Sequence, residues 1–206
     1  YVLDNFSVGE VWTTGQISSE EMYGDFIKII RDKGITHRIV TQRTKLADIG
    51  GVEISVLNPP APLTGMPDND FTTANDASLV MRLALGEVAF LLTADIAAAT
   101  EMRFVREHAL QKSDVLWVPH HGGFSSSTLP FLRRVSPRIA LVSCGAGNTF
   151  GDPHPDVLRR YRLFKTHIFR TDQDGAVKVT TDGRMITARG FLGQNLSLFP
   201  RKTFPD

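Results

Sequence analysis

Three short segments place metal-competent side chains directly after apolar, strand-like runs. They are residues 93–96 (TADI), 118–123 (VPHHGG) and 150–155 (FGDPHP). A rigid sheet can aim side chains from the ends of its strands at a common point. A carboxylate oxygen can bridge two divalent cations while imidazole nitrogens fill further coordination positions. Together the three segments predict a divalent metal site.

Each segment also has a structural interpretation. Asp95 could serve only as the N-cap of the helix that follows it, and His154, between two prolines, could be an ordinary loop residue. The pair His120 and His121 is more informative, because two imidazoles between a buried strand and two glycines need polar partners. The pair therefore favours a metal or substrate role. The other histidines are interpreted as structural: His37, His108 and His167.

The helices and strands that must position these side chains are predicted from the periodicity of hydrophobic residues and from capping and turn residues. Ser18 and Ser19 precede an amphipathic pattern that predicts a helix over 20–33. The further expected elements are strands at 37–42 and 51–58, an exposed loop at 59–74, a hairpin of 78–85 and 88–93, a helix at 97–111, a strand at 114–118, a helix at 129–135, a strand at 138–143, a helix at 155–164, and strands at 167–170, 176–180 and 185–189. This alternation indicates a layered α/β domain with mixed sheets over 1–190. Residues 191–206 show no clear period, and we expect them to be a disordered tail.

Length, composition and charge limit the classes of protein to which the chain can belong. The chain has 206 residues, of which 42% are hydrophobic and 22% charged, as expected for one globular domain. No apolar run approaches the roughly 18 residues of a membrane span. The net charge of +1 does not indicate a nucleic-acid binder by itself. The densest basic segment is 159–170, where a solvated helix face is favoured over a phosphate track. The lone Cys144 cannot form an internal disulfide.

A family resemblance enters through long blocks that occur in a fixed order. NDASLVMRL, FLLTADI, DVLWVPHHGG, FLRRVSPRIALVSCGAGNTFGDPHPDVL and FRTDQDGAV resemble the metallo-β-lactamase-like domain of the ComEC family of DNA-uptake proteins, from about residue 2 to 179. Three positions depart from the family's TGD, HHGS and GHPHP motifs. Ala94, Gly123 and Asp152 stand where the family has glycine, serine and histidine.

The resemblance implies an αββα sandwich of mixed sheets flanked by helices, with a two-metal centre at one edge. Asp95 would bridge the metals, and His120 or His121 would be a ligand, with the other imidazole near the phosphate or supporting a ligand. Manganese and zinc both suit mixed oxygen and nitrogen ligands. By analogy, Asn75 would make a polar substrate contact or be a weaker ligand, and further substrate contacts would come from Ser126, Ser127 and His154.

The family's main ligand motif, HxHxDH, does not occur in these residues. We expect it in a segment before Tyr1 of a longer protein, and we expect the chain alone to bind metal poorly and to be inactive. The implied function is phosphodiester hydrolysis that degrades the DNA strand not transported during competence. The implied partners are single-stranded or double-stranded DNA and the membrane-embedded channel of the same polypeptide, with no nucleotide cofactor.

Two alternatives remain: a non-catalytic DNA-binding module of the channel, or an esterase of another substrate on the same fold. The implied location is a soluble domain of a bacterial inner-membrane protein, on its extracellular or periplasmic face.

Overall fold

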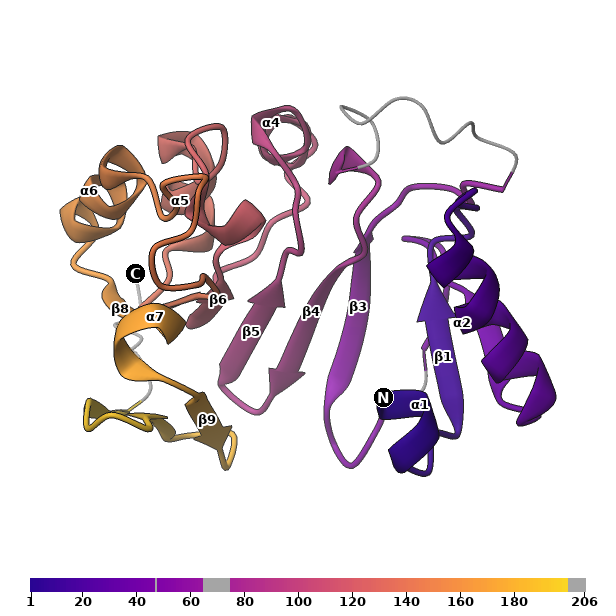
Figure 1. Ribbon diagram of the computed structural model, residues 1–206. Helices are drawn as coiled ribbons and strands as arrows, with labels where there is room; N and C mark the ends of the chain where they lie inside the picture. Colours follow the sequence, from indigo (N-terminus) through magenta and orange to yellow (C-terminus); the bar gives the residue numbers. More distant parts are fainter. Residues whose placement is uncertain (47, 65–74, 200–206) are drawn as a thin grey trace.

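The computed structural model describes residues 1–46, 48–64 and 75–199 (Figure 1). Its main element is a six-stranded mixed sheet in the order β3-β4-β5-β6-β7-β8. The pairs from β3 to β5 are antiparallel, and those from β5 to β8 are parallel. The strands are β3 (Glu53–Asn58), β4 (Val80–Leu85), β5 (Val88–Leu92), β6 (Val115–Trp117), β7 (Ile139–Val142) and β8 (His167–Arg170).

Side chains alternate between the two faces of this sheet, as the pleat requires. Leu91, Leu116 and Ala140 pack into one cluster with buried residues of three helices. These helices are α4 (Ala98–Arg106), α5 (Leu129–Val135) and α6 (Pro155–Leu163). Fully buried rings such as Phe104 and Phe131 stabilise the layer by about 1.5–3 kcal/mol each. The helices therefore cover one face of the sheet (Figure 1).

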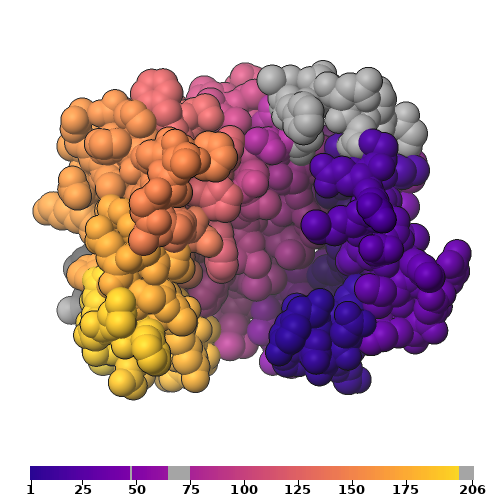
Figure 2. Space-filling model, in the orientation of Figure 1, coloured from indigo at the N-terminus to yellow at the C-terminus, as the bar shows by residue number. Residues whose placement is uncertain are grey.

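The opposite face carries a small antiparallel sheet in the order β11-β10-β9. Its strands are β9 (Val177–Thr181), β10 (Ile186–Gly190) and β11 (Asn195–Leu198). Ile186 and Ala188 are fully buried against Val88 and Ile139. Figure 2 shows these C-terminal residues in yellow on one flank and the N-terminal residues in indigo on the other.

The expectation of a disordered tail after Gly190 is wrong for 195–198. This segment pairs with β10, and its two leucines, Leu196 and Leu198, pack against the second core cluster. Such a short strand is stabilised by its neighbour and by burial, and its local pattern is too brief to predict it. Residues 200–206 of the same tail lie outside the described part of the chain.

The N-terminal part forms a β-α-β unit. Strands β1 (Glu10–Thr13) and β2 (Thr36–Ile39) are parallel and are joined by α2 (Glu21–Asp32), after a first turn of helix, α1 (Val2–Asn5). The main-chain N–H of Gln42 donates to the carbonyl of Pro59 at 2.8 Å, which ties this unit to the end of β3.

The predicted elements are present with shifted ends, and the molecule is a mixed α/β protein with a mixed sheet. The helix expected to reach residue 111 ends at Arg106, shortly before His108, whose φ of +53° is incompatible with a right-handed helix. The predicted loop at 59–74 is described only to residue 64. Assignment to the metallo-β-lactamase fold stays a prediction.

Among the described residues, no helix is both long and apolar enough to cross a bilayer.

Candidate functional site

The C-terminal ends of β5, β6 and β7 meet at one edge of the main sheet, because these strands run parallel. Asp95 follows β5, and His121 lies after β6 in a tight turn, η1 (Pro119–Gly122), in which both histidines have non-helical backbone angles. The Nε2 atom of His121 lies 3.7 Å from Oδ1 of Asp95, and both side chains are about half exposed. The structure thus brings two of the predicted ligands together at the solvent edge.

The second ring nitrogen of His121 fixes the orientation of the ring. Nδ1 lies 2.8 Å from the main-chain carbonyl of Ser143, at the end of β7. Since a carbonyl can only accept, Nδ1 carries the proton in this bond, and the lone pair of a neutral ring remains on Nε2. Histidine ligands in metal proteins are held in this way, with one nitrogen donating to a carbonyl and the other free for the metal.

His120 lies in a different environment. Its Nδ1 is buried, and no described residue is a hydrogen-bond partner for that atom. Its main-chain N–H donates to the carbonyl of Ala94 at 3.0 Å, and its ring centroid is 6.5 Å from that of His121. Both histidines have positive φ, 51° and 53°, in a region that costs residues with a Cβ free energy. Of the two, His121 has the geometry of a ligand.

The main chain before Asp95 is strained in the same way. Ala94 has a φ of +47°, and the left-handed region costs an alanine about 1 kcal/mol relative to glycine. The resembled family has glycine at this position, and the backbone conformation gives the physical reason.

Asp95 does not cap the helix that follows it. The N-cap of α4 is Ala97, and no side chain forms a capping hydrogen bond there. The main-chain N–H of Asp95 donates to Oγ of Ser78 at 3.3 Å, while Oδ1 of Asp76 accepts from Oγ1 of Thr100 at 2.8 Å. These contacts hold the turn and leave the carboxylate of Asp95 facing His121.

Asn75 directly precedes Asp76 and is partly buried. Its carbonyl accepts a hydrogen bond from the main-chain N–H of Ser78 at 3.0 Å. The substrate contact expected of its side chain stays a prediction.

Ser126 and Ser127 were expected to line the site, but the structure buries both completely. The hydroxyl of Ser126 donates to the carbonyl of Pro119 at 2.9 Å. The hydroxyl of Ser127 lies 2.9 Å from that of Tyr161. Both hydroxyls are occupied inside the protein, so the expectation that they contact substrate is corrected to a structural role.

A buried carboxylate organises this serine loop. Glu101 of α4 is fully buried and accepts hydrogen bonds from the main-chain N–H groups of Ser127 and Thr128, the latter at 2.7 Å. Arg160 of α6 donates to the carbonyl of Ser126 at 2.7 Å. Burial raises the pKa of Glu101, although its hydrogen bonds and the nearby Arg160 act in the opposite direction. Burial likewise raises the pKa of Tyr161.

Sequence reasoning missed Glu101, although a signal existed. It lies three residues before the buried Phe104 in the same helix, and so on the same face. A charged residue on the buried face of an amphipathic helix usually has a specific partner.

His154 has a structural role that its sequence context allowed. It is the N-cap residue of α6, and its Nδ1 accepts from the main-chain N–H of Asp156 at 3.2 Å. Its main-chain N–H donates to the carbonyl of Gly122 at 2.9 Å, and its ring lies 4.9 Å from that of Phe124. These contacts fix the third segment against the histidine loop. A substrate contact by His154 stays a prediction.

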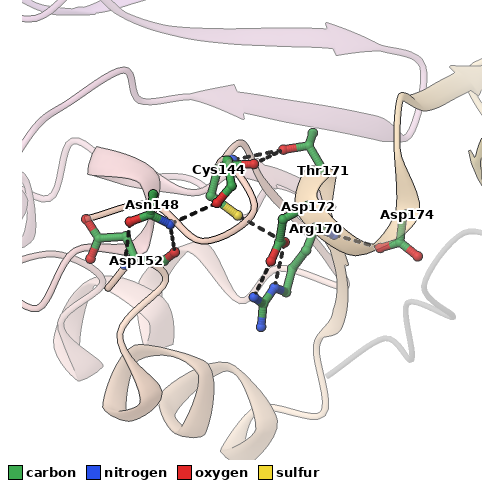
Figure 3. Close-up of polar contacts among 8 residues, drawn as sticks. Cys144, Asn148, Asp152, Arg170, Thr171, Asp172 and Asp174 are labelled. Atoms are coloured by element: carbon green, nitrogen blue, oxygen red, sulfur yellow. Dashed lines mark hydrogen bonds and ion pairs between the residues drawn. The ribbon is translucent and has the colours of Figure 1, made fainter. Parts of the chain in front are cut away.

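A cavity of about 290 Å³ opens beside His121. Asp152 lies in its wall, in a loop held by Asn148, whose side chain donates to the carbonyl of Asp152 at 2.6 Å (Figure 3). A Cβ at Gly123 would lie 3.6 Å from Oδ2 of Asp152 and 3.1 Å from the carbonyl of His120. Glycine in place of the family's serine therefore leaves room beside this carboxylate. The lining residues are His121, Ser143, Cys144, Gly145, Asn148, Phe150 and Asp152.

Cys144, in the wall of this cavity, joins a polar cluster at the end of β8 (Figure 3). Its Sγ donates to Oδ1 of Asp172 at 3.1 Å, and Arg170 makes a bidentate pair with the same carboxylate at 3.0 and 2.6 Å. The Arg170 guanidinium lowers the pKa of Asp172, whereas burial raises the pKa of the Cys144 thiol. The cysteine is thus a protonated, supporting group.

Asp95 and His121 fit two positions of a divalent cation, because they offer an anionic oxygen and a neutral nitrogen. Within the described ranges, no three His, Cys, Asp or Glu side chains converge closely enough to hold a metal ion. The predicted two-metal centre therefore rests on these two side chains alone.

Comparison with known proteins identifies competence-related homologues. The chain is 29% identical over 161 residues to ComE operon protein 3 of Bacillus subtilis, covering 78% of this chain and 20% of that protein. It is 37% identical over 114 residues to Recombination protein 2 of Haemophilus influenzae, covering 55% and 14%. It is 35% identical over 105 residues to Competence protein ComA of Neisseria gonorrhoeae, covering 50% and 15%.

The matched segment thus spans at most about a fifth of these relatives. No family model matches the chain.

Proposed function

We propose that this chain is part of a metal-dependent phosphodiesterase that hydrolyses DNA within a competence protein of the ComEC type. The observation that carries the proposal is the pair Asp95 and His121, with Nδ1 of His121 bound to the carbonyl of Ser143. This arrangement leaves the two metal-competent atoms side by side at the exposed end of a parallel sheet, a usual place for a catalytic site. The names of the homologues support a role in competence.

A divalent ion held by Asp95 and His121 would activate water and stabilise charge on a phosphate. The chain's own residues keep the two ligands oriented through the strained turns at Ala94 and His121. Two aromatic rings flank the same edge: Phe150 is 87% exposed and Phe124 is 63% exposed. Exposed rings beside a site are suited to stacking on bases of single-stranded nucleic acid.

In this proposal the degraded DNA is the strand that is not transported. The domain would be the soluble part of a bacterial inner-membrane protein, on its outer face, next to the channel of the same polypeptide. The metallo-β-lactamase fold and the choice of manganese or zinc are parts of the same proposal.

A second candidate is a non-catalytic module that holds DNA near the channel. One observation favours it: only two metal-competent side chains converge within the described residues. The carboxylate of Asp152, where the resembled family has histidine, also favours the non-catalytic module. An esterase of another substrate has no such observation in its favour.

The test is hydrolysis of labelled single-stranded DNA by the purified protein that contains this chain, with Mn²⁺, with Zn²⁺ and with chelator. We expect metal-dependent hydrolysis that Asp95→Asn abolishes. The matched control is Asp25→Asn, which removes an exposed carboxylate from α2, an element that contributes nothing to the site. DNA binding without hydrolysis under every metal condition would reject the phosphodiesterase and support the binding module.

A further inference from the structure

Two adjoining cavities lie along β8, the edge strand of the main sheet. One has a volume of about 410 Å³ and the other about 330 Å³, and His167 lines both. The two adjoining cavities are together called the groove. The groove runs between the C-terminal part of α6 and the strand, near β11. Its charged and titratable lining side chains are Arg138, Arg162, Lys165, His167 and Arg170.

No carboxylate lines either cavity. Arg138 pairs with Asp114 at 3.6 Å, and Arg170 pairs with Asp172, so these two charges are balanced. Arg162 and Lys165 are exposed and form no ion pair with any described residue. The groove therefore presents at least two uncompensated positive charges.

The structure divides the basic segment 159–170 into two parts. Arg159 pairs with Asp156 at 2.8 Å, and Arg160 donates to main-chain carbonyls of the serine loop, so these two are engaged within the protein. Arg162 and Lys165 lie instead on the groove. The solvated helix face favoured from sequence therefore accounts for only part of this segment.

Side-chain contacts connect one end of the groove to the cavity beside the candidate site. Arg170 lines it at the C-terminal end of β8 and, through Asp172, contacts Cys144 (Figure 3). Cys144 in turn lines the cavity beside His121. Because β7 and β8 are parallel, their C-terminal ends lie side by side, and Arg170 lies at the C-terminal end of β8, on the same edge of the sheet as the Asp95–His121 pair.

We propose that this groove binds successive phosphate groups of a single nucleic-acid strand and guides the strand to the Asp95–His121 edge. In taking DNA as the ligand, the inference rests on the proposed function. Arg162 and Lys165 contact phosphates, and His167, between the two cavities, lies at their junction. A cationic groove without carboxylates follows a phosphate backbone without reading its sequence.

The test is fluorescence anisotropy of a labelled oligothymidylate of about 16 nucleotides, with chelator present so that hydrolysis cannot interfere. The variant is Arg162→Ala with Lys165→Ala. The control is Lys28→Ala with Arg106→Ala, which removes the same charge from two exposed cations of α2 and α4 that line none of these cavities. Each protein is titrated over a range of salt concentrations, and circular dichroism checks that the variants stay folded.

We expect the groove variant to weaken binding at least tenfold. Its slope of log affinity against log salt should fall by about 1.4, since each lost contact to a single strand contributes about 0.7. The control should keep both the affinity and the slope. Equal losses in the two double variants would overturn the groove, because binding would then follow net charge alone.

Displacement of the oligonucleotide by inorganic phosphate, beyond the effect of chloride at matched ionic strength, would assign the groove to a small anion and overturn the strand. Failure of the groove proposal can be distinguished from failure of the proposed function. Loss of hydrolysis in Asp95→Asn with binding intact tests the metal site, whereas the groove is tested with no metal present.

Discussion

The buried carboxylate of Glu101 offers the sharpest test of how the site loop is held. It is fully buried, and its two oxygens accept hydrogen bonds from the main-chain N–H groups of Ser127 and Thr128. Replacing Glu101 by alanine leaves both donors without their acceptor. Replacing it by glutamine leaves one oxygen acceptor and turns an amide NH₂ toward the other donor.

The magnitude follows from the number of donors that lose a partner. Each buried, unsatisfied donor costs about 1–3 kcal/mol. The free energy of unfolding should therefore fall by about 1–3 kcal/mol in Glu101→Gln and by about 2–6 kcal/mol in Glu101→Ala. Arg160, whose charge lies near Glu101, also loses a favourable neighbour in both variants.

Urea unfolding followed by circular dichroism measures these differences. The control is Glu107→Gln, just after the same helix, where the carboxylate is 47% exposed and pairs with Arg103 at 3.2 Å. Exposed pairs of this kind contribute about 0–1 kcal/mol, so the control should change stability little. Equal losses of stability in Glu101→Gln and Glu107→Gln would refute the assignment of Glu101 as the residue that holds the loop.

Three further predictions follow from the same structure. Burial raises the pKa of Glu101 above 4.5, so the native state holds the proton of this carboxyl more tightly than the unfolded state does. The stability that this group contributes is therefore full below about pH 4.5 and is lost as pH rises through the native pKa. Urea unfolding across this pH range should show wild type losing stability relative to Glu101→Gln, and a constant difference between the two would contradict the prediction. Ala94→Gly should raise the free energy of unfolding by about 0.5–1 kcal/mol, because glycine adopts the positive φ of this position without strain. Thermal denaturation measures the change, and a variant less stable than wild type would refute the claim that the backbone is strained at Ala94. Phe150→Ala should weaken binding of single-stranded DNA by about 1–3 kcal/mol through lost stacking and should weaken binding of duplex DNA less. Fluorescence anisotropy measures both affinities, and equal losses for the two forms of DNA would exclude stacking by this exposed ring.

Much of this arrangement could be predicted from sequence because strand ends and polar segments coincide. The apolar runs before Asp95 and His121 are adjacent parallel strands, so their C-terminal ends had to meet. The different surroundings of His120 and His121 could not be predicted. They depend on two left-handed backbone conformations and on the carbonyl of Ser143, which directly follows β7 and lies 22 residues after His121 in the chain.

The serines were misjudged for a similar reason. Ser127 was placed at the site by analogy with the resembled family, but Glu101 and Tyr161 contact it from two different helices. Such contacts between distant segments leave no local periodicity. The strand at 195–198 was missed because four residues carry too little pattern without the pairing to β10.

The central claim is that Asp95 and His121 together bind a divalent cation. The most direct measurement is a titration of the 206-residue chain with Mn²⁺, followed by electron paramagnetic resonance, for wild type and for Asp95→Ala, His121→Ala and His120→Ala. We predict weak binding that the first two variants abolish and that His120→Ala retains, because only His121 presents a free Nε2 to Asp95. Absence of binding in wild type, or binding that survives both Asp95→Ala and His121→Ala, would contradict the account.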